Sequence, residues 1–266
     1  MVLTAENYYS RKADQEYMSV SQYKDFAGTY GKMPCEFCAM EKLRGNWEET
    51  KTTALLVGSY VDSYFEGSLE SFKKENSEIF RQDGQLKSNY VQADEIIKRI
   101  KRDDYFMRCL SGEKQVIMTG KLFGAKWKIK MDSFLPGAAI VDLKVVESII
   151  KPKWVRDIGY MDFIRFWGYD IQGAVYQEIV RQNTGKRLPF FIAAATKEKP
   201  QADIRVIKIE QNYLDEALTM VEMNLPRILR VKSGEEEPDR CDFCDCCKKN
   251  RVLNGYISVH DLAMSI

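Results

Sequence analysis

The segment 113–144, which reads EKQVIMTGKLFGAKWKIKMDSFLPGAAIVDLK, constrains the fold more than any other part of the chain. Apolar and polar residues alternate through 127–135, and short apolar runs flank this stretch at 116–118 and 138–146. Period-two alternation interrupted by Gly and Pro is typical of strands joined by tight turns. We therefore predict three consecutive strands, the first two connected by a turn near 120–124.

Three charged residues fall at informative places in these strands. Asp132 lies in the second strand run, and Asp142 and Lys144 stand two apart in the third, so the latter two share one face. Two carboxylates about 4 Å apart repel by roughly 4 kcal/mol at an effective dielectric near 20. A shared proton or a hard cation such as Mg²⁺ would offset this repulsion, and a nearby lysine could stabilise charge on a phosphate. The alternative is that all three are ordinary polar residues on a solvated sheet face.

These residues also carry a resemblance. Asp132 followed by Asp142-Leu143-Lys144 resembles the PD-(D/E)xK nuclease core, although Met131 stands where the motif has Pro. Gln172 and Tyr176 match the QxxxY motif of its RecB-like branch, which includes lambda exonuclease and the CRISPR adaptation nucleases. The greatest similarity is to the exonuclease VIII (RecE-like) nucleases of phages and prophages.

The resemblance covers Ser19 to about Leu262 and implies an α/β fold. The expected architecture is a restriction-endonuclease-like core, with a mixed central sheet of about five strands flanked by helices on both faces. We divide the chain into an N-terminal helical segment that packs on the core (1–50), the PD-(D/E)xK nuclease core (51–232) and a Cys-rich C-terminal segment (233–266), all within one structural domain.

The resemblance also implies a set of site residues. The catalytic residues would be Asp132, Asp142, Lys144 and Glu113. The ligands for Mg²⁺ or Mn²⁺ would be Asp132, Asp142, Glu113, Asp62 and the backbone carbonyl of Leu143. Asp62 stands where the family often has a histidine, and its alternative is a surface role. Lys130, Gln172 and Tyr176 would bind substrate. Alternatively, Lys130 only softens the carboxylate repulsion, and the Gln172/Tyr176 pair makes a routine surface contact.

Six of the seven cysteines lie in two clusters far apart in the sequence. In a reducing cytosol such clusters favour metal binding over disulfides. Cys35, Cys241, Cys244 and Cys247 would offer four thiolates, which suit Zn²⁺ or a [4Fe–4S] cluster and resemble the iron–sulfur staple of RecB-like nucleases. Cys38 or Cys246 could substitute for one of them, and the alternative is a reduced cluster without metal.

Hydrophobic periodicity and capping residues place the remaining elements. We expect helices and strands at these positions: helices from Ser19 or Ser21 to about Ala27, Cys35–Leu43, Thr52–Glu66, Ser88–Arg102, Phe163–Asn183 and from 212 or 213 to Val231, and strands at Arg187–Ala195 and Ile204–Ile209.

The net charge of +1 indicates that any contact with nucleic acid depends on local basic clusters. Basic residues interleave with aromatic rings in 151–167, a composition that suits single-stranded nucleic acid. We expect most of these rings in the core and one or two of them to face the substrate. The sequence has no apolar run long enough to span a bilayer and no apolar signal core near its start. We therefore expect a cytoplasmic protein without a membrane segment.

The leading hypothesis is a Mg²⁺- or Mn²⁺-dependent DNA exonuclease that hydrolyses phosphodiester bonds of linear DNA in phage or prophage recombination. The resemblance implies these partners: a duplex end or a single strand, further copies of this chain and a single-strand annealing protein. One alternative is a DNA-end-binding module with a degenerate site, because the family histidine is absent and the net charge is small. Another is a nuclease of the CRISPR-adaptation kind, which an intact four-cysteine cluster would favour.

Overall fold

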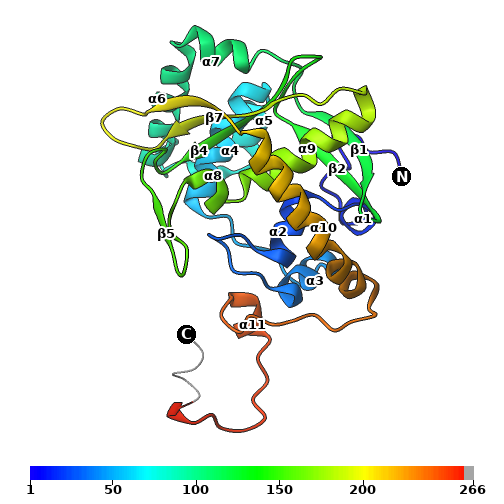
Figure 1. Cartoon of the computed structure of the whole chain (residues 1–266). Helices are drawn as coiled ribbons and strands as arrows, with labels where there is room; N and C mark the ends of the chain where they lie inside the picture. Colours follow the sequence, from blue (N-terminus) through cyan, green and yellow to red (C-terminus); the bar gives the residue numbers. More distant parts are fainter. Residues whose placement is uncertain (261–266) are drawn as a thin grey trace.

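A computed structural model describes residues 1–260, so Leu262, where the resemblance was expected to end, lies outside the described residues. Its main sheet has four strands in the order β3-β4-β7-β8, in which β4 and β7 are parallel and the other two pairs are antiparallel. The strands are β3 (Ser133–Leu135), β4 (Ala139–Val146), β7 (Phe190–Thr196) and β8 (Ile204–Lys208). Helices cover both faces of this mixed sheet (Figure 1), which confirms the predicted α/β class.

The predicted run of three strands divides between two sheets. β1 (Val116–Leu122) and β2 (Ala125–Met131) form their own antiparallel ribbon, and the chain bends at Asp132 before β3 joins the main sheet. The main sheet therefore has four strands where we expected about five, because β1 and β2 pair only with each other. The turn between β1 and β2 falls at Phe123 and Gly124, whose φ angles of 49° and 86° suit a two-residue hairpin turn.

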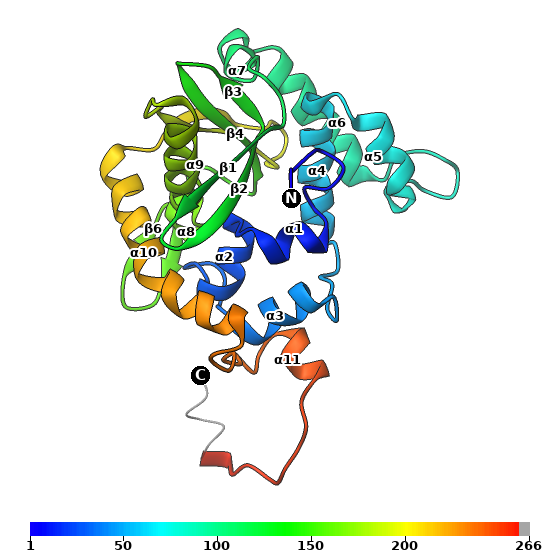
Figure 2. The ribbon, with the colours of Figure 1, turned by 90° about the vertical axis from the view of Figure 1, so that its right-hand side faces the viewer.

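Each face of the main sheet has its own apolar cluster. Along β4, Ile140 packs with the first cluster, against α9 (Tyr169–Thr184) and α10 (Gln211–Ser233), whereas Val141 packs with the second, against α4 (Thr53–Glu66) and α6 (Ser88–Lys101). Figure 2 shows these two groups of helices on opposite sides of the strands. Because side chains alternate along a strand, Asp142 and Lys144 lie on the same face as Ile140, which is the face toward α9.

The single helix predicted at 163–183 is interrupted. It forms α8 (Phe163–Phe166) and α9, separated by Trp167 and Gly168. Gly168 has φ +63°, and an added Cβ would come within 2.9 Å of Thr29 and 3.1 Å of Lys24. The positive φ and the close approach of Thr29, just after α2 (Val20–Ala27), favour glycine here, and the break places Tyr169 at the start of α9.

The N-terminal segment follows the predicted caps and attaches to the edge of β2. Ser19 caps α2, and α3 (Glu36–Arg44) begins after Cys35 and ends at Gly45. Just before α2, the Met18 N–H donates to the Lys126 carbonyl at 2.7 Å, and the Met18 carbonyl accepts from the Lys128 N–H at 2.9 Å. Residues 1–18, including α1 (Arg11–Glu16), are thereby held beside the β1–β2 ribbon (Figure 2).

A short ribbon formed by β5 (Lys153–Val155) and β6 (Gly159–Met161) carries two aromatic rings of the basic stretch 151–167. Trp154 and Tyr160 are 66% and 74% exposed and Trp167 is 39% exposed, so the expectation that most rings of this stretch lie in the core was wrong. Among the described residues this ribbon pairs with no other strand, and its two rings pack edge-to-face with centres 5.2 Å apart. The remaining elements are α5 (Leu69–Glu75), the 3-10 helix η1 (Ser77–Ile79), α7 (Asp104–Cys109) and α11 (Asp245–Lys249). Within residues 1–260, every helix is too short or too polar to cross a membrane.

Candidate active site and thiolate cluster

A cavity of about 900 Å³ opens between α4, α9 and the strands, and every residue predicted for the carboxylate site except Glu113 lines it. Asp62 comes from α4, Asp132 from the bend after β2, and Asp142 and Lys144 from β4. The bend brings Asp132 beside β4, and the alternation of β4 directs Asp142 and Lys144 to the same side. The structure thus brings together three acidic side chains and one lysine that lie between positions 62 and 144 of the sequence.

Asp142 is the most enclosed of these residues, with 2% of its surface exposed. Its Oδ1 accepts a hydrogen bond of 2.6 Å from Gln172 Nε2 on α9. Its Oδ2 is paired with the Lys144 ammonium but accepts no hydrogen bond of good geometry from residues 1–260. Burial lowers the pKa of Lys144, but the charges of Asp142 and Asp132 raise this pKa by more than burial lowers it. The net shift is upward, so the ammonium stays protonated.

Asp132 is fixed by a backbone group of β4. Its Oδ2 accepts the Leu143 N–H at 3.0 Å, at the position where a neighbouring strand would supply a carbonyl. The N–H and C=O of one strand residue point to the same edge, so the Leu143 carbonyl also faces this side. Burial and the nearby charge of Asp142 raise the pKa of Asp132 to about 7.

Asp62 supplies a carboxyl oxygen that nothing in residues 1–260 satisfies. Its buried Oδ1 has no hydrogen-bond partner, and burial together with Asp132 raises its pKa well above the ordinary value. Leaving a buried polar atom unpaired costs about 1–3 kcal/mol, which a ligand would recover. Unsatisfied oxygens of Asp62 and Asp142, beside Asp132, are the donor set that suits Mg²⁺ or Mn²⁺.

The prediction for Glu113 was wrong in its geometry. Glu113 is exposed and is not among the residues that line the cavity. Its backbone makes an antiparallel bridge with Phe134, with N–H to carbonyl distances of 2.8 and 2.9 Å in the two directions, and this bridge fixes the side chain toward solvent. Glu66 and Gln115, which we did not predict, do line the cavity. Gln115 Nε2 donates a hydrogen bond of 2.6 Å to Glu66 Oε1. Glu66 lies one helical turn after Asp62, a spacing that could have identified it.

The three residues predicted to bind substrate all line the cavity, but two of them already have protein partners. Gln172 donates to Asp142, and the Tyr176 hydroxyl donates to the Lys130 carbonyl at 3.1 Å. These contacts orient Asp142 and β2, so they differ from direct substrate contacts. The Lys130 ammonium lies 4.5 Å from the centre of the Tyr9 ring.

Lys24 of α2 also lines the cavity, and we did not predict it from the sequence. Lys24 Nζ donates to the Trp167 carbonyl at 2.9 Å and lies 5.3 Å from the centre of the Tyr169 ring. Burial and the neighbouring Lys144 lower the pKa of Lys24 to about 7. The break between α8 and α9 exposes the Trp167 carbonyl that holds this amine.

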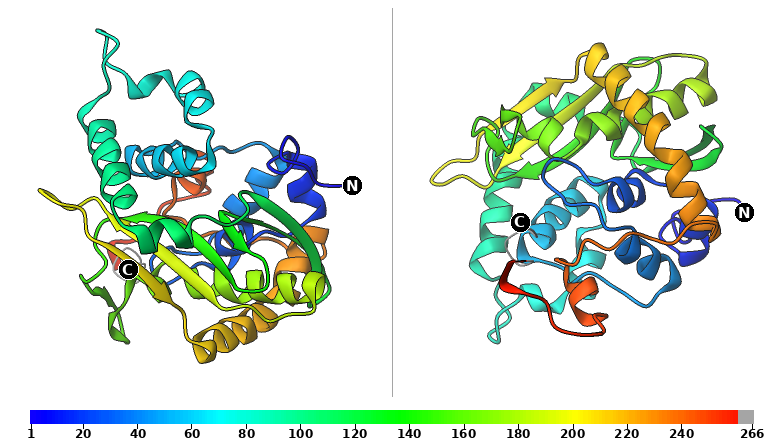
Figure 3. Two further views of the ribbon diagram at one scale, coloured as in Figure 1. Left: turned by 90° about the horizontal axis from the view of Figure 1, so that it is seen from above. Right: turned by 60° about the horizontal axis from the view of Figure 1, so that its bottom comes forward.

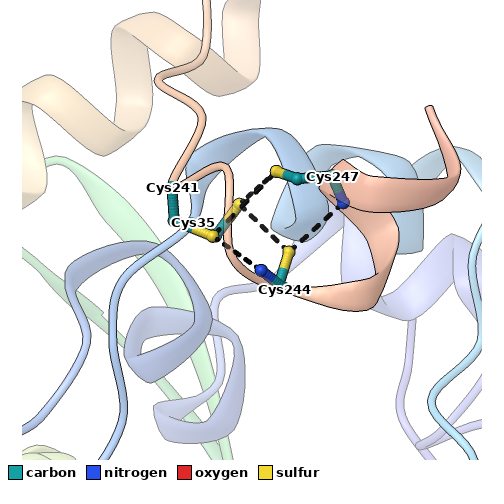
Figure 4. Close-up of side chains that lie close together, drawn as sticks. All are labelled: Cys35, Cys241, Cys244 and Cys247. Carbon is teal, nitrogen blue, oxygen red and sulfur yellow. Dashed lines mark hydrogen bonds between the residues drawn. The ribbon is translucent and has the colours of Figure 1, made fainter. Parts of the chain in front are cut away.

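The four predicted cysteines meet at the other end of the molecule, where α11 lies against α3 (Figure 3). The Sγ atoms of Cys35, Cys241, Cys244 and Cys247 all lie within 4.8 Å of one another. Figure 4 shows the four side chains converging, with Sγ–Sγ distances of 3.5 Å (Cys35–Cys247), 3.8 Å (Cys35–Cys244) and 4.0 Å (Cys241–Cys247). Cys38 and Cys246 pack beside this group but do not belong to it.

These spacings fit a single tetrahedral ion. Zinc–sulfur bonds of about 2.3 Å place the four sulfurs of a tetrahedron about 3.8 Å apart. In a [4Fe–4S] cluster each thiolate binds a different iron, so its sulfurs must stand farther apart. Backbone N–H groups also point at the sulfurs, from Cys38 to Cys35 at 3.4 Å and from Cys244 to Cys241 at 3.3 Å. Against the effect of burial, such donors lower the pKa of Cys241 to about 7, so the cluster is compatible with Zn²⁺.

The fold and the Asp132–Asp142–Lys144 arrangement define a PD-(D/E)xK-type protein. The model of the family described as "PDDEXK-like domain of unknown function (DUF3799)" matches residues 19–250, and the chain belongs to this family.

Solved structures include a relative of similar length. The crystal structure of a protein named "Putative exonuclease" from Eubacterium rectale has 72% sequence identity and a TM-score of 0.98, and the match covers 100% of both chains. A crystal structure of a protein named SSO0001 has 12% sequence identity and a TM-score of 0.28, and the match covers 70% of this chain and 81% of that chain. No curated protein sequence matches the chain.

Proposed function

We propose that the protein is a nuclease that hydrolyses phosphodiester bonds of DNA ends with the help of Mg²⁺ or Mn²⁺. One observation carries the proposal: Asp62, Asp132, Asp142 and Lys144 line one cavity. Within residues 1–260, the buried Asp62 Oδ1 has no hydrogen-bond partner, and Asp142 Oδ2 has only its ion pair with Lys144. Membership of a PDDEXK-like family and the name of the Eubacterium rectale relative support a nuclease.

The residues divide the chemistry between them. Asp132, Asp142, Asp62 and the Leu143 carbonyl would hold the cation, which when bound acts as a Lewis acid toward the phosphate and makes water a better nucleophile. Lys144 stays protonated, so it can orient the attacking water or stabilise the negative charge that develops on the phosphate oxygens. Gln172 and the Leu143 N–H keep two of the carboxylates oriented, which preserves the geometry that the reaction requires.

The test is digestion of linear DNA labelled at either end, with Mg²⁺, with Mn²⁺ and with neither. We expect cleavage only with a cation, and a loss of at least about 1000-fold in Asp142→Asn and in Lys144→Met. Circular dichroism and thermal unfolding check that both variants fold. Undiminished cleavage in either variant would refute the assigned roles.

The same assay separates the alternative of a DNA-end-binding module. That alternative predicts that the wild-type protein retains labelled ends in a binding assay and leaves them intact even in Mn²⁺. The direction of digestion, the recombination setting, the annealing-protein partner, assembly into oligomers, the CRISPR-adaptation alternative and the cytoplasmic location all stay predictions.

A further inference from the structure

The segment before α1 contributes two aromatic rings to the wall of the active-site cavity. Tyr8 and Tyr9 line it together with Lys128 and Lys130 of β2. Neither tyrosine belongs to a motif that we identified in the sequence. The proposed roles of the carboxylates and Lys144 do not involve either tyrosine.

The segment that carries these rings is firmly attached. The Lys128 side chain, which is 1% exposed, donates to the Tyr8 carbonyl and pairs with Asp14 at 2.7 Å. The Tyr17 hydroxyl donates to the Met1 carbonyl at 2.8 Å, closing the segment on itself. A ring held on such a segment is oriented before any ligand arrives, which reduces the entropy lost on binding.

The Tyr9 ring itself is open to ligand. Its side chain is 72% exposed, although it faces a cavity rather than an open convex surface. Tyr8 stands edge-on to it, with ring centres 5.0 Å apart and an interplanar angle of 86°. The Lys130 ammonium is 4.5 Å from the Tyr9 ring centre. An exposed ring beside a cation is the pairing that proteins use to stack a nucleobase and hold its phosphate.

The platform stands next to the carboxylates. Tyr9 and Lys130 line the same cavity as Asp132 and Asp142, and Lys130 precedes Asp132 by two residues. On this placement, a base stacked on Tyr9 would belong to a nucleotide near the phosphate held at the carboxylates. The cavity volume of about 900 Å³ falls in the range of small-molecule sites, about 300–1,000 Å³, so there is room for an unpaired nucleotide.

We propose that Tyr9, with Lys130 beside it, is a stacking platform for an unpaired nucleobase adjacent to the scissile phosphate, so that the site receives a single-stranded or frayed end. The inference rests on the proposed nuclease function. It assigns Tyr9 to substrate binding and makes the N-terminal segment part of the active site.

The test uses the full chain with Asp142→Asn, which keeps bound DNA uncut, and duplexes with 5′ or 3′ overhangs that carry 2-aminopurine in the unpaired part. Stacking on an aromatic ring quenches this fluorescent base. We expect quenching by the parent on one of the overhangs and much weaker binding of blunt duplex. Tyr9→Ala should lose the quenching and weaken binding by about 5- to 100-fold, whereas Tyr9→Phe should retain both.

Tyr105→Ala is the matched control, because Tyr105 is 59% exposed, lies 5.7 Å from Arg108 and does not line the cavity. With an intact Asp142, Tyr9→Ala should raise KM more than it lowers kcat. If wild type cleaves DNA and Tyr9→Ala binds and quenches like its parent, the platform is refuted and the nuclease proposal stands. If the parent binds no DNA and wild type cleaves none, both are refuted.

Discussion

The two candidate metal sites of this protein differ in how complete they are within the protein itself. At the thiolate cluster, four sulfurs lie within 4.8 Å of one another, and those of Cys35, Cys241 and Cys244 accept backbone N–H groups. At the carboxylate cavity, the acidic oxygens of the described residues do not form a comparably close group. The Asp142 carboxylate instead accepts a hydrogen bond from Gln172 and forms an ion pair with Lys144. The cluster is therefore closed around one position, whereas the cavity leaves room for a substrate.

This difference follows from the chemistry of the donors. Neutral thiols can pack together because they carry little charge, and burial raises the pKa of Cys35, which keeps it protonated without metal. Carboxylates packed as closely would repel one another, so Lys144 stands among them and compensates part of their charge. A structural site can be closed in this way, and a catalytic site must keep positions open for substrate and water.

The sharpest test of the closed site is Cys247→Ser. Cys247 is fully buried and joins the C-terminal segment to α3 through Cys35. Losing one ligand of a structural metal should lower the free energy of unfolding by on the order of 4 kcal/mol. Denaturant unfolding measures the loss, and elemental analysis should find about one zinc per wild-type chain and none in the variant. Cys109→Ser, outside the cluster, is the control; equal losses in the two variants would contradict the assignment.

At the open site, Asp62→Asn should reduce metal-dependent cleavage by on the order of 100-fold without loss of stability, because it removes a buried carboxylate with an unpaired oxygen. Cleavage rates against Mn²⁺ concentration and thermal unfolding give the two readouts. Glu113→Gln is the matched comparison, and its activity should match wild type because Glu113 points to solvent. The reverse ranking would restore Glu113 as a ligand.

The open site should also make stability depend on pH. The pKa of Asp132 rises from 3.8 to about 7 on folding, so the folded state binds this proton more tightly than the unfolded state. Its contribution is fully present below pH 3.8 and is lost as the pH rises through about 7, by roughly 2 kcal/mol between pH 5 and 7. Urea unfolding without Mg²⁺ or Mn²⁺ measures this slope. Asp132→Asn should flatten it, and an unchanged slope would count against the assignment.

The smallest expected effect concerns Gln172, which we assign to positioning. Gln172→Met keeps the volume of the side chain but removes the donor to Asp142 Oδ1. We expect a roughly 10-fold higher Mn²⁺ concentration for half-maximal cleavage, with the fold intact. A loss of DNA binding at saturating Mn²⁺ would instead return Gln172 to the substrate-binding role that the sequence predicted.

Short-range patterns in the sequence determined much of this protein. Ser19, Thr52 and Gly45 mark helix ends where capping rules place them, because a cap depends on residues within one turn. The spacing of Asp142 and Lys144 fixed their common face, since side chains alternate along any strand. The spacing of Cys241, Cys244 and Cys247 predicted most of the thiolate cluster, because residues three apart in a helix or tight turn lie close together.

Tertiary structure decided what depends on contacts between distant segments. Gly168 adopts a left-handed conformation between α8 and α9, where Thr29 and Lys24 come close to it, and the sequence around Gly168 does not record these distant contacts. Glu113 turns outward because its backbone pairs with Phe134, while Glu66 and Gln115 enter the cavity from separate elements. Tyr9 reaches the site only because residues 1–18 bind along β2. The periodicity of a helix or strand determines on which face of that helix or strand a side chain lies. Which other part of the protein this face contacts depends on how the whole chain packs.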